Sequence, residues 1–367
     1  MFGGYFRADL EHPNNPNNAR LIFSKGHAAP LLYALYAAAG KVSEEEIKTL
    51  RKFGSRLEGH PTMEFPYTEA PTGSLGQGLS IGVGMAINAK YLDKLPYKTF
   101  VLLGDSEMAE GSVWEAMALA AHYALDTLVA ILDVNRLGQR GETMHGHDIE
   151  AYRKKAEAFG WHVIVIEDGH DIEKIKSAYE EAAAGKEKPS IIIAKTQKGK
   201  GFPGVENRED WHGKALKGEE FDMAIAALGD VDTSARGTIL QSEKMEPAPY
   251  APEAGEKIIY KERAATRRAY GNALIRLHKK FPEMVVLDAE TSNSTYAELF
   301  KKKYPDRFFE MYIAEQNMVG AALGLARRGK LPCVSTFAAF FTRAFDQIRM
   351  CGYSDARIIF AGSHAGV

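Results

Sequence analysis

Short apolar runs alternate with longer segments of helical spacing through the middle of the chain. The apolar runs are rich in Val, Leu and Ile and occupy Phe100–Leu103, Leu128–Val134, Trp161–Ile166 and Ser190–Ala194. The segments between them carry charged outer faces and occupy Ser112–Leu125, Asp148–Phe159 and Asp171–Gly185. This alternation predicts right-handed βαβ units and therefore a parallel sheet. Helices that would cover its faces are predicted upstream, at Ala28–Ala39, Ser43–Phe53 and Gly76–Leu92.

A second unit of the same kind follows a stretch without clear periodicity. Residues 229–261 contain Pro247, Pro249 and Pro252 among Gly, Ser and charged residues, which is typical of a linker. Beyond it, helices are predicted at Arg263–Lys280, near Thr295–Lys302, at Glu315–Arg328 and at Ala338–Cys351. Strands are predicted at Met284–Leu287, Phe308–Tyr312, Cys333–Ser335 and Arg357–Ala361. The sequence therefore predicts an α/β protein with a first domain at 1–228, a linker at 229–261 and a second domain at 262–367.

Composition and charge narrow the class of protein. A length of 367 residues is enough for two domains, and the net charge of −2 argues against a dedicated nucleic-acid binder. The longest apolar stretch is broken by Pro30 and is too short to cross a membrane, so no membrane association is expected. Two cysteines are too few for a disulfide framework. These features predict a cytoplasmic protein.

Two polar residues follow sequential predicted strands. Asp105 comes just after the run that ends at Leu103, and Asn135 follows the run that ends at Val134. Because parallel strands bind ligands at their carboxyl ends, both oxygens are expected in one crevice. One carboxylate, an amide oxygen and a nearby backbone carbonyl suit Mg²⁺ when phosphate oxygens and water complete the shell. Capping of helices and turns by the same two side chains is an equally open interpretation at this point.

Loops with glycine and histidine supply further candidates. The segment Thr72–Leu79 reads Thr-Gly-Ser-Leu-Gly-Gln-Gly-Leu and opens a predicted helix, so its backbone N–H groups suit a phosphate. It follows no recognisable strand and lacks an acidic partner for a ribose, which disfavours a nicotinamide dehydrogenase. Histidines lie beside Gly or Pro at four apparent loops, namely His27, His60, His212 and His364. Each alone is typical of a structural or surface residue, but four together favour proton transfer near neutral pH.

The second unit has a polar and an aromatic candidate. Glu315 begins a mostly apolar helix, where it would also meet the helix dipole favourably. Phe337, Phe340 and Arg343 recur at the spacing of one helical turn. Core packing is the ordinary interpretation of such a stripe, and stacking on a flat ring is the alternative.

Taken together and in order, these motifs identify a family resemblance. The motifs are Ser24-Lys-Gly-His-Ala-Ala-Pro30, Thr72-Gly-Ser-Leu-Gly-Gln-Gly78, Gly104-Asp105 with Asn135-Arg-Leu-Gly-Gln139, Trp211-His-Gly-Lys214, Ala265-Thr-Arg267, Asn293-Ser-Thr295, Ala314-Glu-Gln-Asn317 and Ser335-Thr-Phe-Ala-Ala-Phe-Phe-Thr-Arg343. Across essentially its whole length the chain resembles transketolase, of the shorter type also found in animals. The resemblance implies a thiamine diphosphate-binding fold, with a diphosphate domain followed by a pyrimidine domain. It also implies transfer of a two-carbon ketol unit between sugar phosphates in the pentose phosphate pathway.

The resemblance also implies roles for particular residues. Glu315, His60 and His212 would be catalytic, with Glu315 bonded to the aminopyrimidine ring so that the ring can take a proton from the thiazolium carbon. The implied metal ligands, for Mg²⁺ or alternatively Ca²⁺ or Mn²⁺, are Asp105, Asn135 and the backbone carbonyl of Leu137. The implied cofactor contacts are His27, Gly73, Ser74, Leu75, Gly104, Ser106, Asn135, Lys198, His212, Phe337 and Phe340, the last two flanking the pyrimidine. The implied substrate contacts are His27, His60, Arg267, Ser294 and His364.

The resemblance also implies substrates and a subunit arrangement, and it shows where this chain differs from the family pattern. Xylulose 5-phosphate and ribose 5-phosphate are the implied substrates, and a homodimer is implied whose active sites lie between subunits. The family pattern Gly-Asp-Gly has Ser106 at its third position here, where glycine would allow a close backbone approach. Both chain ends resemble cuts through a longer protein, since family segments upstream of Met1 and beyond Val367 are expected.

Three other interpretations stay open. A catalytically silent chain is one, and a subunit that needs a complementary chain is another. The third is a related ketol-transferring thiamine enzyme, such as dihydroxyacetone synthase or deoxyxylulose phosphate synthase.

Overall fold

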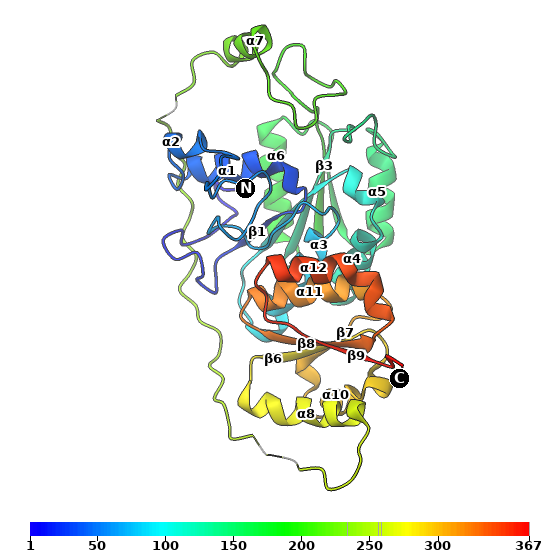
Figure 1. Cartoon of the computed structure of the whole chain (residues 1–367). Coiled ribbons are helices and arrows are strands. Elements are labelled where there is room, and N and C mark those ends of the chain that lie inside the picture. Colours follow the sequence, from blue (N-terminus) through cyan, green and yellow to red (C-terminus); the bar gives the residue numbers. More distant parts are fainter. Residues whose placement is uncertain (233, 256, 258, 367) are drawn as a thin grey trace.

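A five-stranded parallel sheet organises the first half of the chain in the computed structural model (Figure 1). Its strands are β1 (Arg20–Phe23), β2 (Thr99–Gly104), β3 (Leu128–Val134), β4 (His162–Ile166) and β5 (Ser190–Lys195), in the order β1-β2-β3-β5-β4. The structure describes residues 1–232, 234–255, 257 and 259–366. Positions 233, 256 and 258 of the predicted linker, and Val367 of the predicted second domain, lie outside the described residues.

Helices cover both faces of this sheet because successive strand residues point to opposite sides. Phe100 packs in the same cluster as α1 (Ala29–Ala38) and α6 (Ile172–Ala184). Its neighbour Val101 packs instead with the helices of the other face, α3 (Gly78–Ile87), α4 (Gly111–His122) and α5 (Ile149–Ala158). A short helix, α2 (Glu44–Ile47), follows α1.

A second parallel sheet has four strands. They are β6 (Met284–Asp288), β7 (Phe308–Glu310), β8 (Leu331–Phe337) and β9 (Ile359–Ser363), in the order β7-β6-β8-β9. On one face lie α8 (Thr266–Lys280) and α10 (Glu298–Lys303), and the short helix α9 (Ser292–Thr295) contacts α8 and β8. On the other, between the two sheets, lie α11 (Glu315–Arg327) and α12 (Phe345–Tyr353) (Figure 1). The α/β class with parallel sheets predicted from the sequence is therefore confirmed.

The two sheets share one core through the crossing of α3 and α11. Buried side chains of both helices belong to a single apolar cluster that reaches β3 on one side and β8 on the other. Glycines bring the two backbones together: a Cβ added to Gly84 would lie 2.8 Å from the carbonyl carbon of Ala321. A Cβ added to Gly324 would lie 3.0 Å from the carbonyl carbon of Ile81. Ordinary contact begins at 3.4 Å, so both glycines are required by the close approach.

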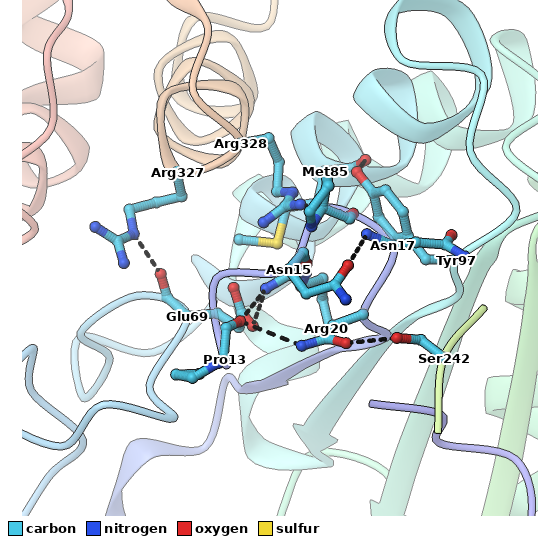
Figure 2. A network of polar contacts seen from close by, with 12 residues as sticks. Pro13, Asn15, Asn17, Arg20, Glu69, Met85, Tyr97, Ser242, Arg327 and Arg328 are labelled. Carbon is cyan, nitrogen blue, oxygen red and sulfur yellow. Dashed lines mark hydrogen bonds and ion pairs between the residues drawn. The ribbon is translucent and has the colours of Figure 1, made fainter. Parts of the chain in front are cut away.

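A polar network closes the same interface at the C-terminal end of α11 (Figure 2). Arg20 is buried and its Nη1 donates to Oε1 of Glu69 at 3.1 Å. Arg327 donates from Nε to the backbone carbonyl of Glu69 at 2.9 Å. Arg20 also donates to the backbone carbonyls of Pro13 and Asn15. Arg328 donates to the backbone carbonyl of Pro16. These bonds join the C-terminal end of α11 to the first unit.

The segment between the two units is bound to both of them. Helix α7 (Glu219–Leu228) precedes it and lies away from the sheets (Figure 1). The Leu240 carbonyl accepts from the backbone N–H of Ala8 at 2.9 Å. Further on, the ring of Tyr250 lies 4.3 Å from the guanidinium of Arg307 and 5.8 Å from Nζ of Lys330. The domain limits 1–228, 229–261 and 262–367 stay a prediction.

Several predicted elements differ from those observed. Strand β1 was not predicted, because it has only four residues and begins with a charged residue, Arg20. Helix α7 was not predicted either, and its large apolar residues are mostly exposed. The helix predicted at Ser43–Phe53 is reduced to α2, none of whose residues is buried. The helix predicted from Ala338 begins at Phe345, after a 3-10 turn at Phe340–Ala344.

Candidate functional site

A pocket of about 740 Å³ opens at the carboxyl ends of the first sheet's strands. We call it the strand-end pocket. Of the residues singled out in the sequence it is lined by His27, His60, Gly73, Leu75, Gly104, Asp105, Ser106, Asn135, Leu137, Lys198 and His212. Residues from seven separate segments thus meet at one place, as expected for a parallel sheet.

The predicted metal ligands lie together in this pocket. Asp105 is buried, and its carboxylate accepts from the backbone N–H groups of Ser106 at 2.9 Å and Arg136 at 2.7 Å. Burial is the largest influence on this carboxyl and raises its pKa. A divalent cation would reverse that preference, since it favours the ionised form. With the Asn135 amide oxygen and the Leu137 carbonyl, the donor set fits Mg²⁺. No cluster of three or more His, Cys, Asp or Glu side chains arranged for a metal occurs among the described residues.

A second carboxylate, Asp133, fixes the amide of Asn135. Its Oδ2 accepts from Nδ2 of Asn135 at 3.1 Å and from Nζ of Lys25 at 2.5 Å. The Asn135 oxygen is therefore turned the other way, where it accepts from the N–H of Leu137 at 3.1 Å. The sequence analysis missed Asp133. Its charge inside the apolar run Leu128–Val134 was a usable signal, because it stands two positions before Asn135 and so points to the same face of the strand.

The glycine-rich loop lies against the loop that carries His27. A Cβ on Gly26 would come within 2.7 Å of the backbone N of Gly73, so these segments touch backbone to backbone. Gly73 has φ +135° and a Cβ there would lie 2.7 Å from the ring of His60. Ser74 differs from its neighbours, because its hydroxyl donates to Asp346 of α12 and it does not line the strand-end pocket.

Three basic residues gather at the mouth of the pocket. The rings of His27 and His212 lie 4.8 Å apart, and Nζ of Lys198 is 3.1 Å from Nδ1 of His212. Lys198 also donates to the carbonyl of Leu137 at 3.3 Å. Desolvation and the nearby positive charge of Lys25 lower the pKa of His27 to about 4. Desolvation and the charge of Lys198 lower the pKa of His212 as well. Both rings are therefore neutral at physiological pH.

A second group of predicted residues surrounds the start of α11, and we call it the aromatic–arginine cluster. It comprises Arg267, Ser294, Glu315, Phe337, Phe340, Arg343 and His364. The buried carboxylate of Glu315 accepts at Oε1 from Nη1 of Arg343 at 2.6 Å. The same guanidinium lies 5.1 Å from the ring of Phe340.

The phenylalanines of this cluster stack on each other. Their ring centroids are 5.1 Å apart with an interplanar angle of 16°. That Phe337 and Phe340 flank the pyrimidine, with Phe340 the stronger candidate, stays a prediction. The ring of His364 lies 4.2 Å from that of Phe337, and its Nε2 is 3.5 Å from Nη1 of Arg267. Arg267 also donates to the Ser294 carbonyl at 3.2 Å.

Within the described chain the two groups of predicted residues are separate. The lining of the strand-end pocket includes neither Glu315 nor the two phenylalanines. One chain therefore holds its predicted site residues in two separate groups. The sequence analysis also missed Glu107, a buried acid two positions after Asp105. The signal was available, because two acids stand close together just after a predicted strand. Among the described residues, no helix is long and apolar enough to cross a bilayer.

Two protein-family models match the chain. The model described as the transketolase thiamine diphosphate binding domain matches residues 1–241. The model described as the transketolase pyrimidine binding domain matches residues 262–367. Transketolase from Homo sapiens is 48% identical over 374 residues, which cover all of this chain and 59% of the relative. Transketolase from Mus musculus is 49% identical over 362 residues, covering 97% of this chain and 57% of the relative.

Solved structures agree with this match. Transketolase from Leishmania mexicana superposes with a TM-score of 0.85 at 27% identity, covering 97% of this chain and 62% of the other. A transketolase from Pichia stipitis, solved in complex with sedoheptulose 7-phosphate, gives 0.83 at 23% identity with the same coverage, and that likeness concerns the fold alone. The chain spans about three fifths of the length of these relatives. The parallel-sheet fold of thiamine diphosphate enzymes predicted from the sequence is confirmed.

Proposed function

Because the chain belongs to the transketolase family, we propose that it serves transfer of a two-carbon ketol unit from a ketose phosphate to an aldose phosphate. The observation that carries the proposal is the meeting of Asp105, Asn135 and the Leu137 carbonyl in one pocket with the glycine-rich loop. A pentose phosphate role, sugar phosphates such as xylulose 5-phosphate and ribose 5-phosphate, and a cytoplasmic setting belong to the same proposal.

Thiamine diphosphate and Mg²⁺ fit the strand-end pocket. Asp105, Asn135 and the Leu137 carbonyl would hold the metal on the diphosphate, and Gly73, Leu75, Gly104 and Ser106 would line the cofactor. Bound thiamine diphosphate supplies the electron sink that lets a carbon–carbon bond beside a carbonyl break and form. His27, His60 and His212 would take and return protons at the substrate's carbonyl and hydroxyl oxygens. The lowered pKa values of His27 and His212 keep those two rings neutral before the substrate binds.

The aromatic–arginine cluster would serve the other end of the cofactor and the substrate. Glu315 would bond the aminopyrimidine, and the outer face of the Phe337–Phe340 stack would pack on that ring. Arg267, with Ser294 and His364 beside it, would bind the sugar phosphate, because a guanidinium suits a phosphate dianion. The exposure of Arg267 leaves it accessible for this contact.

Because the two groups are separate in one chain, we propose a homodimer in which each active site takes one group from each subunit. A specific test mixes two inactive variants, Asp105→Ala and Glu315→Gln. Random pairing would place one undamaged site in half of the dimers, so roughly a quarter of the sites would work again. Recovery of transfer from xylulose 5-phosphate to ribose 5-phosphate supports the pairing, and no recovery from two folded variants contradicts it.

The cofactor proposal is tested by isothermal titration of the purified chain with thiamine diphosphate and Mg²⁺. Binding is expected in the wild type and in Glu150→Gln, a control at an exposed acid of α5, and loss of binding in Asp105→Ala. A wild-type chain that binds the cofactor but transfers nothing favours the alternative of a silent chain or a subunit needing another chain. An acceptor screen separates transketolase from dihydroxyacetone synthase and deoxyxylulose phosphate synthase. A chain that binds no cofactor contradicts the proposal.

A further inference from the structure

We propose that Glu107 is the positioning residue that holds three loops of the strand-end pocket in the shape that receives the diphosphate. The inference deepens the proposed function and rests on it for the identity of the ligand. Glu107 itself is 1% exposed. It is therefore argued to act through the loops that it holds.

Each carboxylate oxygen of Glu107 accepts from a different segment. Oε1 accepts from the Ser24 hydroxyl at 2.6 Å and from the N–H of Gly76 at 2.8 Å. Oε2 accepts from the N–H of Gly104 at 2.8 Å. Ser24 follows β1, Gly76 lies in the glycine-rich loop, and Gly104 ends β2. One side chain therefore joins three segments that are far apart in the sequence.

These segments carry the residues that would meet the cofactor. Ser24 extends the linkage, because its hydroxyl accepts from the N–H of Gly78 at 3.1 Å, at the start of α3. The segment after Ser24 leads through Gly26, which touches the glycine-rich loop directly, to His27. The segment after Gly104 leads at once to Asp105. A shift of Glu107 would thus be transmitted to both the glycine-rich loop and the metal ligand.

A carboxylate suits this position better than a neutral side chain. Backbone N–H groups only donate, and one of them faces each oxygen of Glu107. A glutamine has a single oxygen, so either orientation of its amide sets an NH₂ group against Gly76 or against Gly104. Glu107 accepts from neutral donors, and Lys25, the nearby cation, pairs with Asp133. Three directional bonds therefore hold the buried acid, which fixes the loops that supply them.

The test compares Glu107→Gln with Asp93→Asn by titration with thiamine diphosphate and Mg²⁺. Asp93 is a matched control, because it is a buried carboxylate bonded to Asn88 and Lys330 and does not line the strand-end pocket. Both changes are expected to lower stability. Only Glu107→Gln is expected to raise the dissociation constant, by about tenfold or more, while Asp93→Asn leaves it within about twofold.

Hydrogen exchange supplies a readout that needs no cofactor. The amides of Gly76 and Gly104 are expected to exchange faster in Glu107→Gln than in the wild type, and to keep their protection in Asp93→Asn. If Glu107→Gln does not fold, Ser24→Ala replaces it. That variant keeps both backbone bonds to Glu107 and removes the hydroxyl, so a smaller loss of affinity and faster exchange at Gly78 are expected.

The outcomes separate this inference from the proposed function. Unchanged affinity and unchanged exchange in Glu107→Gln overturn the positioning role, as does an equal loss of affinity in Asp93→Asn. A wild-type chain that binds no thiamine diphosphate overturns the proposed function instead. In that case exchange at Gly76 and Gly104 still decides whether Glu107 holds the loops.

Discussion

The crossing of α3 and α11 allows a sharp prediction about stability. In Gly84→Ala the new Cβ would lie 2.8 Å from the carbonyl carbon of Ala321, against 3.4 Å for ordinary contact. The obstacle is backbone, so no change of rotamer relieves it. The helices must separate by about 0.6 Å or more at this point, enough to forfeit roughly a quarter of the dispersion energy of contacts across the gap.

The expected cost follows from these numbers. Overpacking a well-packed core costs about 1–3 kcal/mol, and a clash with backbone belongs at the upper end. Replacing Gly by Ala inside a helix returns about 1 kcal/mol. We therefore expect Gly84→Ala to lower the free energy of unfolding by about 2 kcal/mol. With an m-value of about 3 kcal/mol/M, the midpoint in urea would fall by about 0.7 M.

A matched control distinguishes the clash from the helix propensity. Gly352 lies in α12 with no atom within 4 Å of an added Cβ. Gly352→Ala is therefore expected to be neutral or to stabilise by up to about 1 kcal/mol. Urea unfolding followed by circular dichroism compares the midpoints of the two variants and the wild type. A Gly84→Ala midpoint equal to or above that of the wild type would refute the close approach of the helices.

Three further predictions concern single side chains. Ser106→Gly should leave the affinity for thiamine diphosphate unchanged or tighten it in a calorimetric titration, and a large loss would mean that the serine hydroxyl is needed. Lys330→Met leaves the buried carboxylate of Asp93 without its cation and should lower the free energy of unfolding in urea by about 3–5 kcal/mol; a loss below 1 kcal/mol would contradict this. The pKa of His27 lies at about 4 in the folded chain, below its ordinary 6.5, so the unfolded chain takes up this proton first as the pH falls. The stability that His27 contributes is complete above pH 6.5 and lost between pH 6.5 and 4, and His27→Gln should flatten the pH dependence of the urea midpoint across that window.

The sequence predicted the parts of the fold that depend on local pattern. Strands β2, β3 and β5 are mostly buried apolar runs and the edge strand β4 is half-buried, and each was predicted to within about two residues because its apolar residues leave a continuous signal. Strand β1 lacked that signal: its first residue, Arg20, is charged, and what allows its burial is Glu69, 49 positions later. The delayed start of α12, at Phe345 instead of Ala338, was equally hidden, because the aromatic residues after Phe337 recur at helical spacing.

The candidate site was predictable where side chains follow strand ends. Asp105 and Asn135 lie in the strand-end pocket because the sheet brings the ends of β2 and β3 together. Glu107 and Asp133 each left a local signal, but their partners lie far away in the sequence: Ser24 and Gly76 bond Glu107, and Lys25 bonds Asp133. No local pattern records those partners. The orientation of Ser74 depends on Asp346, 272 residues away, for the same reason.

The docking of the segment after α7 onto the start of the chain has a consequence for synthesis. Asn17 bonds the Glu243 carbonyl and Asn18 bonds Ser242, so these partners are separated by 226 and 224 residues. On a ribosome that adds about 5–20 residues per second, the first twenty residues would wait roughly 11 to 45 s for their partners to appear. During that interval Ala8, Asn17 and Asn18 would lack these later partners, whereas β1 can already pair with β2. The nascent chain would therefore present this region to chaperones until the connecting segment had left the exit tunnel.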